Sequence, residues 1–182
     1  FTEPHASEYF ASINNLHNEI PPRICSWREK FKLLEKSGID FAFFLKFNNS
    51  LRTMSPENFI SEILDSINLK SFTVGDDFRF GLDRKGDTDQ LREWGKKRGI
   101  LVENTETILY KDERVSSSRI RKALIDNNFK LAEKLLGRPY TFSGKVVHGQ
   151  HLGRTIDIPT ANIWLPKQKL PIQGVYLSLI HI

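Results

Sequence analysis

The sequence predicts an α/β fold with a doubly wound parallel sheet, followed by a smaller and separate β module. Up to residue 137, short apolar runs alternate with helical patterns, which is typical of parallel strands joined by crossover helices. From residue 138, glycine, proline and alternating apolar residues predict hairpin-like strands instead. We therefore place domains at residues 1–137 and 138–182.

The first elements follow from local signals. Residues 1–5 leave a strand for a loop, and Ser26 with Glu29 forms a capping box that opens a helix. Residues 41–47 form a nearly continuous apolar run, which predicts a strand covered on both faces. Ser55 caps the next helix and is followed by a proline in its first turn.

The alternation continues through the rest of the first domain. A strand is predicted at residues 71–74, followed by a helix at about 88–98 and a short strand at 100–103. Leu91 and Trp94 fall on the inward face of that helix. Two further short helices precede residue 137.

Ligands of such folds lie beyond the carboxyl ends of the strands. That rule selects residues 4–5, 75–81 and 115–118. In the last of these, three consecutive serines open a helix and are followed by Arg119 and Arg121, where hydroxyls, backbone N–H groups and the helix dipole favour anions. The segment could bind a triphosphate. Alternatively, a serine caps an ordinary helix and the arginines face solvent.

A second candidate site lies in residues 144–162. Gly149 and Gly153 permit positive φ angles that turn backbone N–H groups toward an anion, and Arg154 adds a planar cationic fork. There is no Walker lysine motif, so ATP binding here would use another architecture. The alternative is a solvated hairpin turn.

Thr160 and Asn162 are two residues apart. On an extended segment their side chains point the same way and offer neutral oxygens to a hard cation such as Mg²⁺. The alternative is that Pro159 marks an edge strand and that both side chains satisfy local backbone groups.

Composition narrows the function classes. The net charge of +5 favours anionic partners, but no basic strand studded with aromatic residues indicates RNA binding. The single cysteine excludes a disulfide framework and a multi-thiolate metal site, and it fits a reducing cytosol. No signal peptide or membrane-spanning run is visible. Nucleotides, nucleic acid and a merely soluble surface all suit the basic charge. We predict a cytoplasmic protein without nucleic-acid or membrane partners, and we leave a homo-oligomer open.

Four motifs, spread over almost the whole chain, resemble those of prokaryotic bifunctional FAD synthetases (riboflavin kinase/FMN adenylyltransferases). Residues 1–5 (FTEPH) are similar to F-x-P-H, and residues 74–81 (VGDDFRFG) to V-G-x-D-F-R-F-G. Residues 114–121 (RVSSSRIR) resemble S-S-T-x-I-R, with Ser118 in place of threonine. Residues 136–162 resemble L-G-R-P-Y-x-x-x-G-x-V-V-H-G followed by G-x-x-x-G-R-x-x-x-x-P-T-A-N.

This resemblance implies a Rossmann-like nucleotidyltransferase domain with a parallel sheet, followed by an incomplete antiparallel β-barrel riboflavin kinase module. The first would transfer AMP from ATP to FMN, giving FAD, and the second would phosphorylate riboflavin to FMN. ATP, riboflavin and FMN would be the small-molecule substrates, with Mg²⁺ as the metal.

The resemblance also implies roles for individual residues. Those assigned to the ATP phosphates are Arg114, Ser117 and Arg121. Those assigned to the ATP and flavin pockets are Pro4, His5, Gly75, Asp77, Phe78, Phe80 and Ser116, and in the kinase loop Gly149, Gly153, Arg154 and Pro159. Those assigned to Mg²⁺ are Thr160 and Asn162. Alternatively, Asp77 caps a turn, and Phe78 and Phe80 are plain core.

Some expected parts are missing, and we interpret the sequence as a fragment. The family's H-x-G-H segment would precede Phe1, and its kinase glutamate would follow Ile182. Residues 148–151 (HGQH) are not that segment, because their order is reversed relative to H-x-G-H. Asp157 stands before Ile-Pro-Thr-Ala-Asn, where the family commonly has a small residue such as glycine. We therefore expect this chain alone to be inactive or impaired.

Two other functions remain open. One is a nucleotidyltransferase with a different acceptor, such as pantetheine phosphate or nicotinate mononucleotide, against which the Pro-Thr-Ala-Asn segment argues. The other is a non-catalytic protein that binds flavin or nucleic acid.

Overall fold

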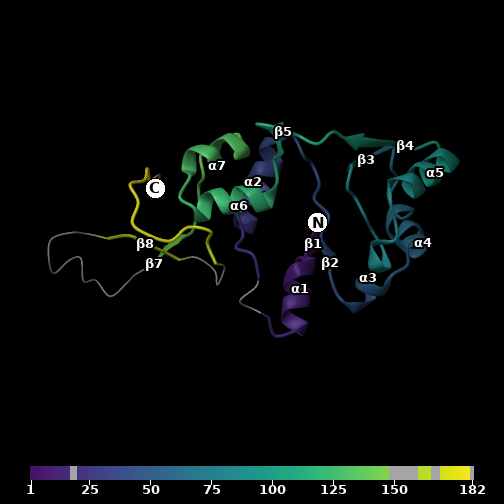
Figure 1. The fold of residues 1–182 in the computed structure, drawn as a ribbon. Coiled ribbons are helices and arrows are strands. Elements are labelled where there is room, and N and C mark those ends of the chain that lie inside the picture. Colours follow the sequence, from purple (N-terminus) through teal and green to yellow (C-terminus); the bar gives the residue numbers. More distant parts are fainter. Residues whose placement is uncertain (17–19, 148–159, 165–168, 181–182) are drawn as a thin grey trace. The chain divides into compact units, whose positions relative to one another are not determined.

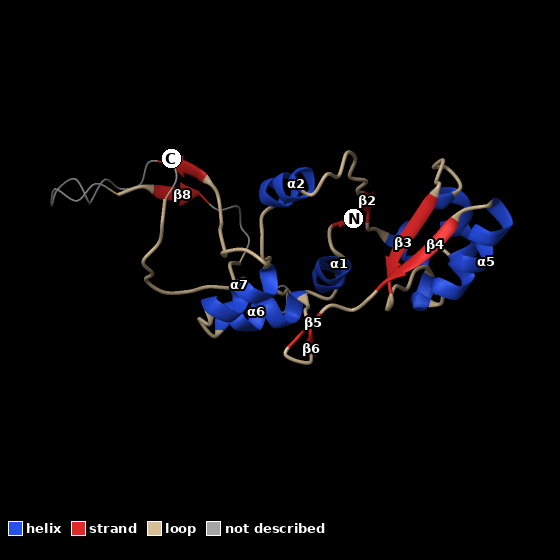
Figure 2. Cartoon of the chain, turned by 90° about the horizontal axis from the view of Figure 1, so that it is seen from above, coloured by secondary structure: helices blue, strands red, loops and turns tan. Residues whose placement is uncertain are grey.

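The computed structural model describes residues 1–16, 20–147, 160–164 and 169–180. They fall into two compact units, and each is described by itself. The first comprises Phe1–Ile20 and Ala42–Arg114, and the second Pro21–Phe41 and Val115–Ile182. Both contain helices and short strands, so the predicted α/β class is confirmed (Figure 2). The predicted domain boundary at residues 137 and 138 stays a prediction.

The first unit contains two pairs of parallel strands. β1 (Thr2–Glu3) pairs with β2 (Leu45–Lys46), and β3 (Ser71–Gly75) pairs with β4 (Leu101–Thr105). β3 and β4 are in register from end to end, so that Gly75 lies opposite Thr105. Within the described residues these strands form separate two-stranded sheets, not one continuous sheet. The strand direction is therefore the expected one, while the doubly wound arrangement stays a prediction.

Helix α5 (Thr88–Arg98) lies beside β3 and β4 (Figure 1). Its bounds match the sequence prediction because both ends are set locally. The Asp87 side chain accepts hydrogen bonds from the backbone N–H groups of Asp89 and Gln90, and Gly99 ends the helix with φ of +68°. Gly95 lets the helix approach the following strand, since a Cβ there would lie 2.6 Å from the Ile100 carbonyl oxygen.

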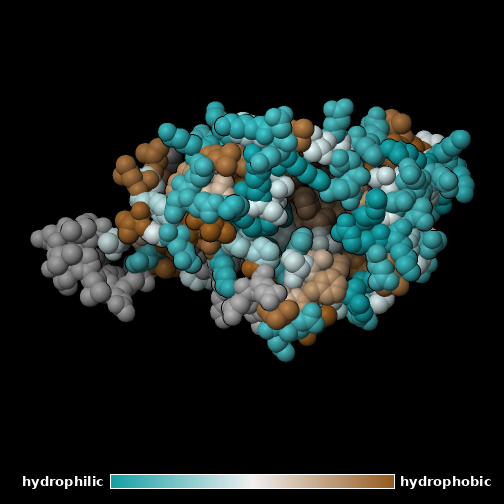
Figure 3. Space-filling model, viewed as in Figure 1, coloured by the Kyte–Doolittle hydropathy of each residue, from teal (hydrophilic) through white to brown (hydrophobic). Residues whose placement is uncertain are grey.

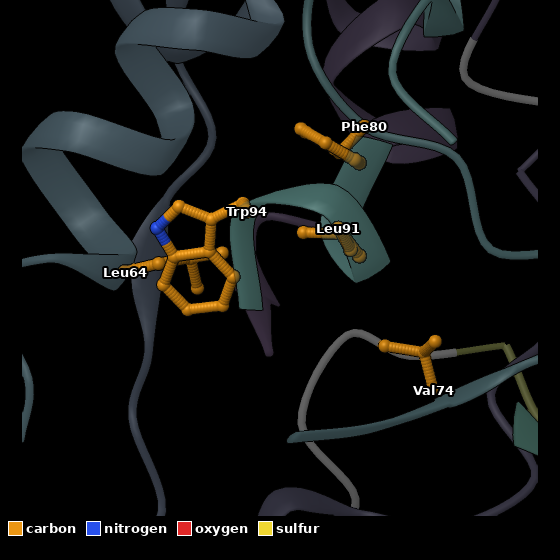
Figure 4. Close-up of a cluster of buried hydrophobic side chains, with 5 residues drawn as sticks. All are labelled: Leu64, Val74, Phe80, Leu91 and Trp94. Atoms are coloured by element: carbon orange, nitrogen blue, oxygen red, sulfur yellow. The ribbon is translucent and has the colours of Figure 1, made fainter. Parts of the chain in front are cut away.

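The core of the first unit packs around this helix. Leu91 is fully buried, and Trp94 is 5% exposed, as the helical spacing predicted. Figure 4 shows the buried cluster, which is formed by Leu64, Val74, Phe80, Leu91 and Trp94. Burying a side chain such as Leu91 contributes about 2 kcal/mol by area, so this cluster stabilises the unit.

The first unit also contains shorter elements. Ser55 caps the helix that follows it, since its hydroxyl accepts from the Asn58 backbone N–H, and the helix continues as a π-helical turn. The remaining elements are α1 (Ala6–Ile13), α3 (Asn49–Thr53), α4 (Pro56–Phe59), η2 (Ile60–Leu64), η3 (Leu82–Arg84), β5 (Leu109–Tyr110) and β6 (Glu113–Arg114). β5 and β6 pair antiparallel.

The strand predicted over residues 41–47 is wrong in extent and in burial. Only β2 is a strand, and the side chains of Phe41 and Phe43 are 81% and 62% exposed. Within the described residues β2 pairs with β1 alone. A strand is covered on both faces only when neighbouring elements lie against it, and an apolar run cannot specify those neighbours by itself.

The second unit is built on three helices. α2 (Trp27–Lys36) begins with the predicted capping box, because Ser26 accepts from the Glu29 backbone N–H and Glu29 accepts from that of Ser26. α6 (Ser117–Ile125) packs against α7 (Phe129–Leu136), which ends at Gly137 with φ of +68°. The side chains buried in this pair are Ile120, Ala123, Leu124, Ala132 and Leu135.

Among the described residues after α7, two short strands are present. β7 (Lys145–Val147) pairs antiparallel with β8 (Asn162–Trp164), and no closed barrel is formed by the described strands. Tyr176 packs edge-on against Phe129, with ring centroids 5.3 Å apart. Apolar side chains also stand out on the outer surface in Figure 3, and the most exposed in this segment are Val175, Leu177 and Leu179. No helix in the described ranges is long and apolar enough to span a membrane.

Candidate active site

The loop that follows β3 carries two adjacent carboxylates. The Phe78 backbone N–H donates to the Gly75 carbonyl at 3.1 Å, which turns the chain immediately after the strand. Asp76 and Asp77 occupy this turn, and both are exposed. A Cβ at Gly75 would lie 3.3 Å from Asp77 Oδ1, a tight contact. The turn therefore presents both carboxylates at the carboxyl end of β3, where the fold rule places ligand sites.

Arg114 lies against these carboxylates. It ends β6, where it pairs with Leu109 of β5. Its Nη1 lies 2.9 Å from Asp77 Oδ2, and its Nη2 lies 3.8 Å from Asp76 Oδ1. The hydrogen bond from Arg114 lowers the pKa of Asp77, and the same bond raises the pKa of Arg114. Both groups stay ionised at neutral pH, so the arginine is held as a cation at this edge.

Sequence reasoning missed Thr107, and it selected residues 75–81 without giving Asp76 a role. The Thr107 hydroxyl donates to Asp76 Oδ2, while Asp76 Oδ1 faces Arg114. Thr107 lies two residues beyond the carboxyl end of β4. The same carboxyl-end rule that selected residues 75–81 would have selected it, had it been applied to the fourth strand as well.

The two predicted aromatic residues of this loop differ in burial. Phe80 is 5% exposed and belongs to the core cluster, where its ring centroid lies 5.1 Å from that of Phe59. Phe78 is half-buried and stacks on Phe80, with centroids 5.8 Å apart. The burial and contacts of Phe80 agree with the alternative interpretation, in which this side chain belongs to the hydrophobic core. A pocket role for either ring stays a prediction.

Pro4 and His5 precede α1. The His5 ring caps that helix, because its Nδ1 accepts from the Ser7 backbone N–H at 3.2 Å, and the His5 backbone N–H donates to Glu8. Accepting this bond requires a lone pair on Nδ1, so a neutral ring carries its proton on Nε2. The His5 side chain is exposed, and Pro4 is half-buried. Their assignment to a nucleotide or flavin pocket stays a prediction.

The serine segment forms the predicted helix start in the second unit. Ser116 caps α6, since its hydroxyl accepts from the Arg119 backbone N–H at 3.2 Å. Ser117 is exposed in the first turn of the helix. Arg121 does not simply face solvent: it is half-buried, and its Nε donates to the Pro22 carbonyl at 2.7 Å. That bond ties α6 to the segment before α2.

The second candidate site, residues 144–162, lies only partly within the described residues. Gly149, Gly153, Arg154 and Pro159 lie outside the described residues. Thr160 and Asn162 are both exposed, and Asn162 begins β8 opposite Val147. No cluster of three His, Cys, Asp or Glu side chains in the described ranges could hold a metal. Neutral side-chain oxygens such as those of Thr160 and Asn162 are ligands that a hard cation accepts.

Two family models match most of this chain. The family model for FAD synthetase matches residues 2–119, about two thirds of the chain, including β1 to the start of α6. The chain belongs to the FAD synthetase family. A second model, for riboflavin kinase, matches residues 136–182. The two models follow one another in the order that the four motifs predicted.

Curated relatives resemble this chain over almost its whole length. It is 41% identical over 175 residues to the bifunctional riboflavin kinase/FMN adenylyltransferase of Escherichia coli K12, covering 96% of this chain and 54% of the relative. It is 39% identical over 181 residues to the protein of the same name from Pseudomonas fluorescens, covering 99% and 56%. The chain thus spans about half the length of the curated relatives it matches.

One solved structure also resembles this chain. It is described as a macrolide-efflux protein from Streptococcus pneumoniae, and it superposes with a TM-score of 0.71 at 32% sequence identity. The match covers 84% of this chain and 49% of the other. The chain therefore shares its fold with that structure over the matched part.

Proposed function

We propose that the protein carrying this chain makes FAD in two steps, phosphorylation of riboflavin to FMN and adenylylation of FMN. The observation that carries the proposal is the pair of family models, FAD synthetase at residues 2–119 and riboflavin kinase at 136–182, on one chain. The name shared by the Escherichia coli and Pseudomonas fluorescens relatives supports it. ATP, riboflavin and FMN are the proposed substrates, and the cytoplasm is the proposed location.

The finer architecture belongs to the same proposal. We infer a Rossmann-like nucleotidyltransferase domain over residues 1–137, supported by the parallel pairs β1–β2 and β3–β4. We infer part of an antiparallel β-barrel kinase module over residues 138–182, supported by the antiparallel pair β7–β8. In the first domain, carboxyl-end loops would hold the nucleotide.

In the adenylylation step, a phosphate oxygen of FMN attacks the α-phosphorus of ATP. A new P–O–P bond forms, the bond between the α- and β-phosphates breaks, and pyrophosphate leaves. The protein's contribution is to hold the reactants in line and to neutralise the phosphate oxygens. We assign that role to Arg114, Ser117 and Arg121, with Ser116 fixing the helix start; Pro4, His5, Gly75, Asp77, Phe78 and Phe80 are assigned to the surrounding pocket.

Each assigned side chain has a chemical reason. The guanidinium of Arg114 has five N–H donors, and its contacts with Asp76 and Asp77 need not use them all. Ser117 offers a hydroxyl and a first-turn N–H at the positive end of the α6 dipole. Arg121 uses its Nε for the Pro22 carbonyl, so a phosphate contact would involve its terminal nitrogens.

In the kinase step, a riboflavin hydroxyl oxygen attacks the γ-phosphorus of ATP. A new P–O bond forms, the bond between the γ-phosphorus and the bridging oxygen breaks, ADP leaves, and the hydroxyl proton is released to solvent. Thr160 and Asn162 would hold Mg²⁺; their neutral oxygens and exposure fit an ion that takes its remaining ligands from phosphates and water. The ion would neutralise the phosphate charge. Gly149, Gly153, Arg154 and Pro159 are the proposed phosphate loop.

Chromatographic separation of flavins tests the proposal. The completed reading frame and this chain would each be incubated with Mg-ATP and either riboflavin or FMN. We expect the complete protein to form FMN and FAD, and this chain to form little of either. If the complete protein forms neither product, the proposal fails, and a protein that binds flavin or nucleic acid without turnover becomes the better interpretation.

Two variants of the complete protein separate the two sites. Arg114→Gln should lower FAD formation from FMN by about 100-fold, the scale for losing a donor to developing charge, and leave riboflavin phosphorylation intact. Asn162→Ala should do the reverse. Matched controls are Arg92→Gln, in an exposed pair with Asp89, and Asn104→Ala, on the exposed face of β4. If either site variant lowered both activities equally, the assignment of two sites would be wrong.

A further inference from the structure

One carboxylate at the end of the β3–β4 pair contacts two other side chains. Asp76 lies one residue beyond β3, and Thr107 lies two residues beyond β4. Because the strands are parallel and end together, both segments leave the sheet at the same edge. The Thr107 hydroxyl donates to one oxygen of Asp76, and the other oxygen lies 3.8 Å from Arg114 Nη2.

Thr107 and Arg114 stand at the two ends of one small hairpin. Thr107 precedes β5 by two residues, and Arg114 pairs with Leu109, the first residue of that strand. Asp76 belongs to the β3 loop. It therefore fastens the start of the hairpin through Thr107 and the end of the hairpin through Arg114.

Exposed ion pairs alone hold a side chain weakly, because water and salt compete for both charges. The Arg114 side chain is 50% exposed, and that of Asp76 is 48% exposed. The hydroxyl of Thr107 supplies what such a pair lacks, since it fixes which oxygen of Asp76 faces the arginine. With Asp77 holding Nη1 at 2.9 Å, the two carboxylates then fix the plane of the guanidinium and not only one of its atoms.

We propose that Thr107, acting through Asp76, is a positioning residue that orients the Arg114 guanidinium for ATP phosphates. The inference rests on the proposed role of Arg114 in FMN adenylylation. Thr107 touches no reacting atom in this scheme. It reduces the freedom of a cation that would otherwise have to be ordered when the nucleotide binds.

Three variants of the complete protein test this positioning. Thr107→Val keeps the shape and removes the hydroxyl, and Thr107→Ser keeps the hydroxyl. Thr105→Val is the matched control, because the Thr105 hydroxyl donates to the Val74 carbonyl at 3.4 Å instead. We expect Thr107→Val to raise the KM for ATP in FAD formation by about 3- to 10-fold, the range for one hydrogen bond, with a smaller change in kcat.

Thr107→Ser should return the KM to within about 2-fold of the parent, because the serine hydroxyl can still donate to Asp76. Riboflavin phosphorylation by the same variants should not change, which shows that they are folded. An unchanged KM in Thr107→Val, or an equal rise in Thr105→Val, overturns the inference.

A second measurement needs no turnover. The side-chain Nε–H resonance of Arg114 in ¹⁵N NMR, assigned with Arg114→Lys, should shift and gain mobility in Thr107→Val but not in Thr105→Val. If the Arg114 resonance neither shifts nor gains mobility in Thr107→Val, the inference is wrong, regardless of how much FAD the variant forms. If it shifts while the parent protein makes no FAD, the positioning stands and the proposed function falls, so the two failures are distinguishable.

Discussion

The α5 core and the segment after α7 contain similar apolar side chains but use them differently. In the α5 core, Leu91 is fully buried between a helix and two paired strands. In the segment after α7, Leu177 is 104% exposed, although it belongs to an apolar run. Burial therefore depends on partners that the apolar pattern does not supply.

The two regions also differ in how their backbone is held. β3 and β4 pair over five residues each, and α5 lies against them. β7 and β8 pair over three residues, and residues 169–180 contain no strand. Side-chain substitutions should thus have global effects in the α5 core and local effects after α7.

The largest contrast should come from deleting leucine side chains. Leu91→Ala removes a fully buried side chain and should lower the free energy of unfolding by about 3 kcal/mol. Leu177→Ala should change it by no more than about 0.5 kcal/mol, because its side chain is already exposed to solvent. Denaturant unfolding measures both, and equal effects would contradict the comparison.

A glycine in the α5 core provides the next test. Alanine in a helix normally stabilises by about 1 kcal/mol relative to glycine. At Gly95 the new Cβ would lie 2.6 Å from the Ile100 carbonyl oxygen, which is backbone and cannot move aside. Gly95→Ala should therefore destabilise by about 1–3 kcal/mol, the usual range for overpacking. Lys96→Ala, at the exposed neighbouring position, is the control; a Gly95→Ala protein as stable as the parent would refute the close packing.

The equivalent change after α7 should act locally. A Cβ at Gly144 would collide with the Trp164 carbonyl oxygen across the β7–β8 pair. We expect Gly144→Ala to lower riboflavin phosphorylation by about 10-fold while leaving FAD formation from FMN unchanged, since about 1.4 kcal/mol of local strain corresponds to that factor. Loss of both activities would show that this segment is not energetically separate.

Tyr140, in the segment after α7, is half-buried, unlike Val175 and Leu177. Burial raises its pKa from 10.0 to about 12, and the nearby Glu29 charge adds to the rise. A raised folded pKa means that the stability due to the protonated group is complete below pH 10 and is lost as the pH rises from 10 to about 12. Tyr140→Phe should abolish this loss of stability. Ultraviolet titration measures the pKa of the tyrosine, and denaturant unfolding at pH 10 and at about pH 12 measures the change in the free energy of unfolding.

The same variant tests hydrogen bonding. The Tyr140 hydroxyl is buried and has no hydrogen-bond partner in the part of the chain that the structure describes. Tyr140→Phe should therefore leave stability at neutral pH unchanged or raise it by up to about 1 kcal/mol. A clear loss of stability would indicate that the hydroxyl is in fact bonded.

The smallest expected effect concerns Asp77. Its pKa lies below the ordinary value of 3.8, because Arg114 donates a hydrogen bond to the carboxylate. A depressed folded pKa means that the contribution is present above pH 3.8 and is lost as the pH falls through the folded value. NMR titration of the carboxyl carbon should show Arg114→Gln moving this pKa upward, while Arg92→Gln does not. No upward movement would refute the ion pair.

Local chemistry made several elements predictable. The bounds of α5 follow from Asp87 at one end and Gly99 at the other, and the capping box of Ser26 starts α2 where expected. Helix ends depend on residues within about four positions, so a sequence states them directly. The predicted strand over residues 41–47 failed because strand pairing depends on residues far away in the chain.

The candidate site also has a part that the sequence predicted and a part that only the structure showed. The sequence alone selected Asp77, Arg114 and the serine cap of α6, through motifs and the carboxyl-end rule. It did not show that Arg114 contacts Asp77 at 2.9 Å, or that Arg121 donates to the Pro22 carbonyl, 99 residues away. The four motifs also predicted the family correctly, because four short motifs in a fixed order are specific together even when each one is weak.

The sequence by itself determined helix starts and ends, the family and the residues that carry charge. Each of these depends on residues that are close together in the sequence. Only the tertiary structure decided which apolar side chains are covered and which side chain holds Arg114. Those outcomes depend on the meeting of separate segments, as when the ends of β3 and β4 bring Asp76 and Thr107 together. No local pattern encodes such a meeting, since it is set by strand register and packing over tens of residues.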